Sequence, residues 1–243
     1  AAYTEVDKAE NNPEKAFNVN SKALKNISKN LALLGSYLIH YSTDYVFDGF
    51  KESPYLESDH TSPINVYGKS KLEGEQNIQR NMKNYFILRT SWVIGTYGNN
   101  FAKSIIGLMA EEENLNIIND QYGVPTSTKL LSKVTGMIIS DIKNKNNFLP
   151  GIYNISPKGK ATWYEISKKI LDMSIREKLI PNTHKIKINP IKSINYPAIA
   201  KRPKNSLLNS QKIEKNLDFK IPFWEEDFKE ILKNIFIQNN HDK

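Results

Sequence analysis

Residues 37–49 read YLIHYSTDYVFDG, and the expected fold class follows from this segment and its surroundings. The segment begins with a short, largely apolar run over residues 37–41, which predicts a buried strand. Ser42, Thr43 and Asp44 follow directly. Because parallel α/β sheets bind their ligands at the carboxyl ends of strands, these polar residues are candidates for a functional site. An ordinary strand-ending turn is the structural alternative.

The sequence Tyr67-Gly68-Lys69-Ser70-Lys71 follows after a loop and opens a predicted helix over residues 67–80, with Asn65 as its cap. Tyr67 and Lys71 are four residues apart and share one face of that helix. A nearby ammonium lowers the pKa of a phenol, so this pair could exchange a proton with a carbonyl or hydroxyl oxygen. Thr43 could hydrogen-bond the same oxygen. An amphipathic helix with an ordinary tyrosine and a solvated lysine would give the same spacing.

The rest of the chain alternates between helical and strand patterns. Further helices are expected over residues 13–34, 101–113, 129–143, 162–173 and 223–237, and further strands over residues 85–89, 116–118 and 151–155. Thr162 and Glu165 have the spacing of a capping box. The alternation predicts an α/β fold with a parallel sheet and helices on both faces. The pattern loosens after about residue 150, where a smaller region is expected that interleaves with the first. Residues 175–209 are expected to be irregular.

Two polar segments after the second expected strand are also candidates. Trp92, in the sequence RTSWVIG, could line a substrate ring or pack in the core. Asn99 and Asn100 could cap the next helix or bind a polar ligand. Residues 120–126 form a polar loop before a helix.

The composition narrows the class of protein. The formal charge is +8, but 30 of the 34 basic residues are lysine and are scattered, which disfavours nucleic-acid binding. The chain has no cysteine, which excludes disulfides, thiolate zinc sites and cysteine nucleophiles. A cytoplasmic location is the default expectation, and no apolar run is long enough to predict a membrane span.

Metal binding and oligomeric state have little support in the sequence. The four histidines lack ligand spacing. Glu111, Glu112 and Glu113 are best interpreted as a solvated helix end, so no metal site is predicted. The helices near residues 99–113 and 128–143 could form a homodimer face or pack in the core.

Taken together, these segments resemble the dTDP-4-dehydrorhamnose reductases, which are extended short-chain dehydrogenases/reductases. The resemblance follows the same order along nearly the whole chain, and STDYVF with NVYGKSKLEGE is its most specific pair. The matching segments are AAYTEVDKAE (1–10), HYSTDYVFDG (40–49), SPINVYGKSKLEGE (62–75), LRTSWVIG (88–95), GNNFAKS (98–104), NDQYGVPTS (119–127), GIYNIS (151–156) and KRPKNSLLN (201–209).

The resemblance implies that NADPH or NADH reduces the 4-keto group of dTDP-4-dehydro-6-deoxy-L-mannose to give dTDP-L-rhamnose. It implies a Rossmann-like domain in residues 1–150 and a mainly substrate-binding region in residues 151–243. It also implies a catalytic set in which Tyr67 donates the proton, Lys71 lowers its pKa and Thr43 assists. The implied cofactor-binding residues are Ala1, Ala2, Tyr3, Tyr67 and Lys71. The implied substrate-binding residues are Thr43, Asp44, Tyr45, Trp92 and Arg202.

The resemblance does not account for the glycine motif of the cofactor site, and it leaves two other functions open. No glycine precedes Gly35, whereas the family's glycine motif lies before the AAYT segment. The sequence is therefore expected to lack an N-terminal segment and to bind dinucleotide weakly by itself. A related sugar-nucleotide epimerase or dehydratase would share the Tyr/Lys pair. A regulatory protein, such as the regulatory subunit of methionine adenosyltransferase, would not need a working acid.

Overall fold

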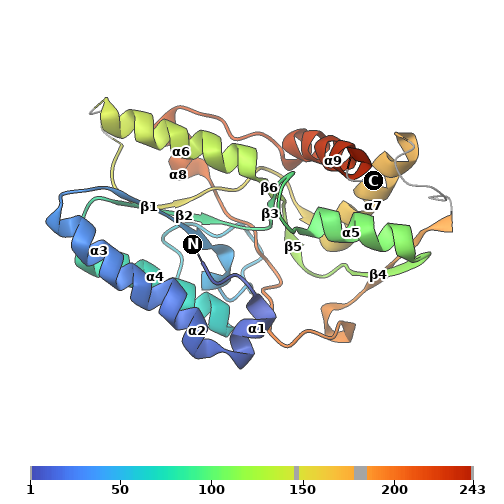
Figure 1. Ribbon diagram of the computed structural model, residues 1–243, viewed down its shortest axis with the longest axis horizontal. Coiled ribbons are helices and arrows are strands. Elements are labelled where there is room, and N and C mark those ends of the chain that lie inside the picture. Colours follow the sequence, from blue (N-terminus) through green and yellow to red (C-terminus); the bar gives the residue numbers. More distant parts are fainter. Residues whose placement is uncertain (1, 145–147, 178–184, 242–243) are drawn as a thin grey trace. The chain divides into compact units, whose positions relative to one another are not determined.

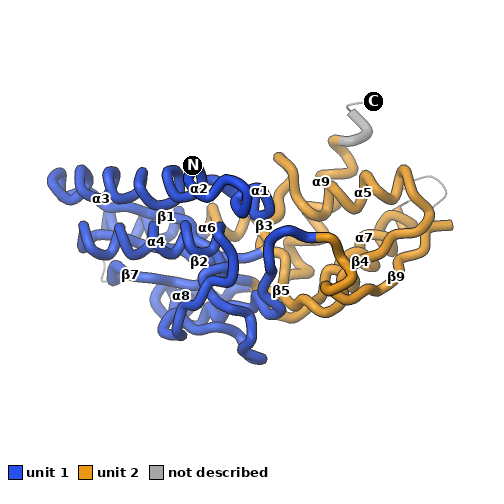
Figure 2. The backbone as a smooth tube through the Cα atoms, turned by 90° about the horizontal axis from the view of Figure 1, so that it is seen from below, with its two compact units in different colours: residues 1–91, 134–156, 198–221 blue, residues 92–133, 157–197, 222–243 orange. Residues whose placement is uncertain are grey.

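A computed structural model describes residues 2–144, 148–177 and 185–241 of the chain. These residues form two compact units that interleave along the sequence (Figure 2). Unit 1 comprises residues 1–91, 134–156 and 198–221, and unit 2 comprises the remainder. Ala1, which was expected at the cofactor, and His184 lie outside the described residues.

Unit 1 is built on a parallel sheet of three strands in the order β1-β2-β7. These strands are β1 (Leu38–Thr43), β2 (Tyr85–Thr90) and β7 (Gly151–Asn154). The register pairs Leu38 with Tyr85 and Thr43 with Thr90, so β1 and β2 end side by side. The predicted α/β fold with a parallel sheet is confirmed.

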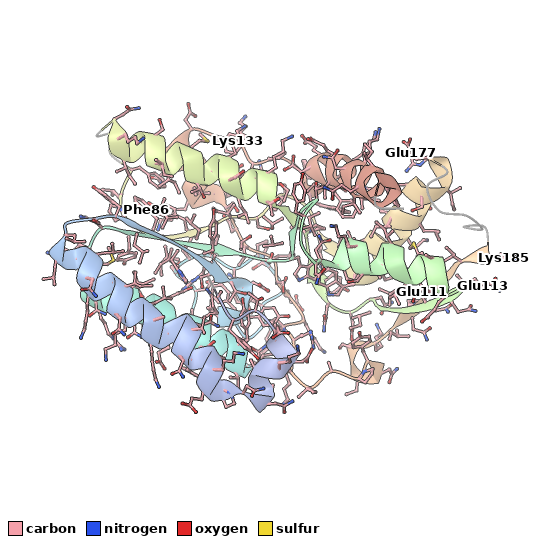
Figure 3. All side chains as sticks on the ribbon, viewed as in Figure 1. Phe86, Glu111, Glu113, Lys133, Glu177 and Lys185 are labelled. Carbon is pink, nitrogen blue, oxygen red and sulfur yellow. The ribbon has the colours of Figure 1, made fainter. Side chains whose placement is uncertain are left out.

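Helices cover both faces of this sheet (Figure 1). The helices α3 (Ala23–Leu33) and α4 (Val66–Asn81) lie on one face, and α6 (Thr128–Lys143) lies on the other. Leu24, Ile78 and Ile87 form part of the core between the sheet and the first two helices. On the other face Phe86, labelled in Figure 3, stacks on Phe148 with ring centroids 5.2 Å apart. Burial of this apolar surface is the main stabilising contribution to such a layer.

The helix predicted over residues 13–34 is divided by a change of pitch. It consists of α2 (Pro13–Phe17), a π-helical turn (Asn18–Lys22) and α3. A π-turn changes the direction of the side chains that follow it and often occurs at functional sites. The remaining short elements of unit 1 are α1 (Val6–Asn11), a 3₁₀ turn (Asp44–Val46) and α8 (Gln211–Leu217).

Unit 2 contains three two-stranded sheets with helices beside them. The strand pairs are β3 (Val93–Ile94) with β6 (Thr126–Ser127), β4 (Asn114–Ile118) with β9 (Lys187–Ile191), and β5 (Tyr122–Gly123) with β8 (Ala161–Thr162). The helices are α5 (Phe101–Glu111), α7 (Trp163–Arg176), α9 (Trp224–His241) and a 3₁₀ turn (Ser193–Asn195). None of the helices among the described residues is long and apolar enough to cross a membrane.

Two expectations for unit 2 need correction. Residues 175–209 were expected to be irregular, but they contain β9, which pairs in parallel with β4. Pro190 interrupts the strand pattern there, and proline is tolerated only where its missing N–H is not needed by a neighbouring strand. The helix expected to reach residue 113 ends at Glu111, and Glu113 instead pairs with Lys185 at 3.8 Å (Figure 3). The capping box of α7 formed by Thr162 and Glu165 is confirmed.

Candidate active site

The candidate site of unit 1 begins where β1 ends. The Thr43 hydroxyl accepts a hydrogen bond from the Tyr45 backbone N–H at 3.2 Å and donates one to Asp44 Oδ1 at 3.1 Å. Thr43 thereby caps the 3₁₀ turn that follows the strand. Its side chain is buried, so the strand end and the turn hold its hydroxyl in one place.

The start of α4 carries Tyr67 against this strand end. Asn65 caps the helix by accepting a hydrogen bond from the Gly68 N–H at 2.7 Å, as predicted. A Cβ atom on Gly68 would lie 2.2 Å from the Tyr45 carbonyl oxygen, so only glycine allows the helix to approach this closely. The rings of Tyr45 and Tyr67 pack edge to face with centroids 5.5 Å apart. Gly68 therefore sets how near Tyr67 comes to the end of β1.

The Tyr67 phenol is held in its protonated form. Burial raises the pKa of Tyr67 to about 12, while its hydrogen bond with Thr43 lowers the pKa and the charge of Asp44 raises it. That Lys71 lowers this pKa stays a prediction from the family resemblance.

Lys71 is buried one turn further along α4. Its Nζ donates to the Tyr41 carbonyl at 2.7 Å and lies 3.1 Å from Nε2 of His40. Burial lowers the pKa of Lys71 to about 8, and the charge of Glu75 acts in the opposite direction. An ammonium bound in this way titrates near neutral pH instead of far above it.

Asp44 is a buried acid beside the Thr43 hydroxyl. Burial raises the pKa of Asp44 to about 6, and hydrogen bonds with Ser206 and Thr43 oppose that change. Burial also raises the pKa of Tyr45, and the charge of Asp44 adds to the effect. The two residues expected at the substrate thus lie directly beside Thr43 and Tyr67.

The N-terminal segment reaches the same helix through Asn20. The Asn20 side chain pairs with both backbone groups of Tyr3, at 2.8 and 2.9 Å, and donates to Ser70 Oγ of α4 at 3.0 Å. Tyr3 is buried in an apolar cluster against which Tyr67 packs. Ala2 is exposed. The π-helical turn that carries Asn20 therefore holds Tyr3 beside the start of α4.

Arg202 lies in unit 1 and is held by Asp7 of α1. The guanidinium donates to both carboxylate oxygens of Asp7, at 3.2 and 2.5 Å, and to the Ala200 carbonyl at 3.2 Å. The guanidinium hydrogen bond lowers the pKa of Asp7. Asn65 donates to the neighbouring Lys201 carbonyl at 2.8 Å, which ties this segment to the N-terminus of α4.

Trp92 belongs to unit 2, where it packs in an aromatic stack. Its ring lies on that of Trp163 with centroids 3.5 Å apart, and Phe101 packs on Trp163 at 4.3 Å. Trp92 has a φ of 46°, a strained value for a residue with a side chain. A Cβ atom on Gly123 would lie 2.6 Å from the Trp92 ring, so glycine is required there.

A buried ion pair supports the site from β2. Arg89 donates to both carboxylate oxygens of Glu75, with Nη2 2.6 Å and Nε 3.0 Å away from them. The guanidinium also lies 5.1 Å from the centre of the Phe47 ring. Because Glu75 follows Lys71 by one turn of α4, the pair fixes that helix on β2.

Several buried oxygens at the carboxyl edge of the sheet lack a partner. These atoms are Ser42 Oγ, Thr90 Oγ1 and Ser91 Oγ. A buried polar atom without a partner is uncommon and indicates a position for water or a ligand. Hydroxyl oxygens of this kind, with the Lys71 ammonium, are suitable partners for the hydroxyls and amide of a nicotinamide cofactor.

Metal ligands are not gathered in the described part of the chain. Within residues 2–144, 148–177 and 185–241, no three histidine, aspartate or glutamate side chains lie close enough together to hold a metal ion.

The fold and the site define a class of protein. A parallel sheet with helices on both faces, and a tyrosine and lysine four residues apart at its carboxyl edge, are the features of a short-chain dehydrogenase/reductase. The family model described as the RmlD substrate binding domain matches residues 1–237. The chain belongs to this family, that of the dTDP-4-dehydrorhamnose reductases. Its members are oxidoreductases of dTDP-rhamnose biosynthesis.

Individual relatives agree with this assignment. The chain is 41% identical to the dTDP-4-dehydrorhamnose reductase of Escherichia coli over 97% of this chain and 78% of the relative. It is 40% identical to that of Salmonella typhimurium with the same coverage. A crystal structure of the Bacillus anthracis reductase in complex with NADP superposes with a TM-score of 0.86 at 35% identity, covering 96% of this chain and 78% of that one.

Some residues around the site were not predicted. Asn20, Asp7, Glu75 and the His40 contact with Lys71 come from segments far apart in the sequence. His40 is next to the STDYVF segment, but nothing in its spacing indicated which side chain it meets. A polar residue inside an otherwise apolar strand was the available signal.

Proposed function

We propose that this site reduces the 4-keto group of dTDP-4-dehydro-6-deoxy-L-mannose, giving dTDP-L-rhamnose, with Tyr67 as the proton donor. The observation that carries the proposal is the packing of Tyr67 on Tyr45, with ring centroids 5.5 Å apart, at the end of β1 that Thr43 caps, with Lys71 one turn away. Membership of the reductase family supports the choice of substrate.

Tyr67 is suited to donate a proton in the direction of reduction. With a pKa of about 12, the phenol is protonated at neutral pH. An alkoxide that forms on the substrate is a stronger base than a phenolate and takes this proton. To stabilise the phenolate, the Thr43 hydroxyl would turn its single hydrogen from Asp44 Oδ1 to the phenolate oxygen. General acid catalysis of this kind contributes about 10²–10⁴-fold to the rate.

Lys71 and the N-terminal segment would serve the cofactor. NADPH or NADH supplies the hydride when it is bound. The Lys71 ammonium would bind the nicotinamide ribose and stabilise the charge that develops on Tyr67. Tyr3, and with it Ala1 and Ala2, would line the cofactor. The bound NADP in the Bacillus anthracis relative supports this class of cofactor.

In unit 1, Asp44 and Tyr45 lie beside Tyr67 and would bind the substrate there. That Trp92 of unit 2 also contacts the substrate stays a prediction from the family resemblance. Arg202 would bind the anionic part of the sugar nucleotide, with Asp7 orienting its guanidinium. A homodimer and a cytoplasmic location stay predictions from the sequence.

The Tyr67→Phe variant tests this proposal. In a chain that oxidises NADPH with this substrate, we expect kcat to fall about 10²–10⁴-fold, with KM little changed. Tyr97→Phe is the matched control, because Tyr97 is an exposed tyrosine of unit 2. Normal turnover by Tyr67→Phe would refute the assignment of the proton donor.

Mass spectrometry of the product separates the alternatives. A reductase adds two hydrogens to the substrate, a dehydratase removes water, and an epimerase leaves the mass unchanged. A folded chain that had none of these activities and formed a stable complex with a synthetase would favour a regulatory protein.

A further inference from the structure

His40 and Lys71 form a buried polar contact beneath the proton donor. His40 lies on β1 with 9% of its surface exposed, and Lys71 lies on α4 with 2% exposed. The Lys71 Nζ is 3.1 Å from His40 Nε2 and 2.7 Å from the Tyr41 carbonyl oxygen. Both acceptors come from consecutive residues of one strand, so β1 defines the position of the ammonium.

The hydrogen-bond inventory determines the state of His40. An ammonium has three N–H donors and no acceptor, so whenever Lys71 is charged, His40 presents a lone pair at Nε2 and carries its proton on Nδ1. Burial lowers the pKa of His40 to about 3, and the charge of Lys71 acts in the same direction. His40 is therefore a neutral acceptor at every pH at which an enzyme of this kind works.

We propose that His40 is a positioning residue, which holds the Lys71 ammonium in place and in its charged form through a hydrogen bond at Nε2. This inference rests on the function proposed for Tyr67 and Lys71. His40 and the Tyr41 carbonyl take two of the three N–H groups of Lys71. The third is left for the ligand that meets Tyr67.

Other charged groups face this contact from the neighbouring elements. Glu75 on α4 raises the pKa of Lys71, but its own carboxylate is paired with Arg89 of β2 at 2.6 Å. Asp44 lies beyond the end of β1. On β2, the residue paired with His40 is the apolar Ile87. His40 thus acts on the ammonium directly, whereas Glu75 is already engaged.

The sign of the effect on stability follows from proton linkage. The pKa of Lys71 is about 8 in the folded chain, against 10.5 for an ordinary lysine. Between these values the unfolded chain binds more protons, so the free energy of unfolding rises with pH in this window. Lys71→Met removes this contribution. The difference between the wild type and Lys71→Met in urea unfolding therefore isolates the titration of Lys71.

The test measures the effect of Lys71→Met on urea unfolding again, in chains that also carry His40→Leu or His40→Gln. In His40→Leu the acceptor is lost, so the pKa of Lys71 in the folded chain falls. The pH range in which the free energy of unfolding rises then begins about one pH unit lower. In His40→Gln a side-chain oxygen can still accept the hydrogen bond, and the window stays near that of the wild type. An unchanged window in His40→Leu, or an equal shift in both variants, would overturn the inference.

Enzyme kinetics give the second readout. If Lys71 must be charged, the basic limb of the kcat/KM profile moves to lower pH in His40→Leu by the same shift, and His40→Gln restores it. His60→Leu is the control, because His60 is exposed on the loop after β1. If Tyr67→Phe is fully active, the proposed function fails. If Tyr67→Phe is inactive and the pH range of rising stability is the same in the wild type and in His40→Leu, only the role of His40 fails.

Discussion

At the scale of single residues, the Tyr67 phenol is subject to two opposing effects. Burial favours the neutral form, and the hydrogen bond with Thr43 favours the phenolate. Burial is the larger effect, which keeps the proton on Tyr67 until a stronger base forms beside it. A group in this state suits proton donation to an alkoxide better than proton abstraction from a hydroxyl.

The ion pair of Glu75 and Arg89 gives a prediction at the same scale. Both side chains are almost fully buried, at 1% and 3% exposed. Removing one partner leaves the other charge buried and unpaired, so Glu75→Gln or Arg89→Met should each lower the free energy of unfolding by about 3–5 kcal/mol. Urea denaturation of both single variants and of the double variant measures this.

The double variant should recover part of the loss, because no buried charge is then left unpaired. Lys129→Met is the control, because Lys129 and Glu230 form an exposed pair and its loss should cost little. Additive effects of the two buried substitutions would contradict the coupling.

At the scale of elements, α4 is the helix that organises the site. Its N-terminus is capped by Asn65, which also donates to the Lys201 carbonyl. Its first turn brings Tyr67 to Tyr45, and its second brings Lys71 to β1. One helix thus carries both members of the Tyr/Lys pair against one strand end.

Gly68→Ala should move this helix away from the end of β1. The added Cβ would meet the Tyr45 carbonyl oxygen at 2.2 Å, which the backbone can relieve only by shifting. We expect a loss of stability of about 1–3 kcal/mol and a larger proportional loss of kcat, because Tyr67 moves with the helix. Thermal unfolding and turnover measure the two effects.

Gly107→Ala on α5 is the matched control. A Cβ at Gly107 meets nothing within 4 Å, so alanine should stabilise that helix by about 0.5–1 kcal/mol. A Gly68→Ala variant that behaved like Gly107→Ala would contradict the close approach of α4.

The aromatic stack of unit 2 is the second element-scale feature. Trp92 has a strained backbone conformation. Its ring stacks on Trp163 and occupies the space where a side chain at position 123 would lie, so Gly123 is needed there. Strain that persists because the surroundings enforce it is typical of ligand-binding positions. This supports the proposed contact of Trp92 with substrate.

At the scale of the whole molecule, the described residues offer groups for the nicotinamide part of a dinucleotide but not for its pyrophosphate. The unpartnered hydroxyls and the Lys71 ammonium suit a nicotinamide riboside, whereas none of the eleven glycines forms a turn before a helix in the first strand-helix unit. Within residues 2–144, 148–177 and 185–241, no such glycine turn therefore offers backbone N–H groups to a pyrophosphate.

We expect the 243-residue chain to bind NADPH weakly, with a Kd above about 100 μM. Reduced nicotinamide mononucleotide, which lacks the pyrophosphate bridge and the adenosine, should bind with similar affinity because both ligands use the same residues. Isothermal titration calorimetry compares them. Tight binding of NADPH alone would show that the chain holds the pyrophosphate after all.

Most of the fold could be predicted from local patterns. The strands β1, β2 and β7, the capping residues Asn65 and Thr162, and the helix α4 all follow from hydrophobic spacing and capping chemistry. The strand β9 was missed because Pro190 breaks its pattern, and α8 because it is short. The extent of each compact unit depends on contacts between distant segments, which no local pattern contains.

The sequence by itself determined the α/β class and the family, because these depend on residue type and spacing along the chain. The set Thr43, Tyr67 and Lys71 was predicted on the same basis and stays a prediction. Only the tertiary structure decided the electrostatics of that set. In the folded chain the Lys71 ammonium donates to β1, and burial has the largest effect on the pKa of the Tyr67 phenol. Burial and partner choice depend on which segments meet in space, so His40, Asn20 and the Glu75–Arg89 pair emerge only in the folded chain.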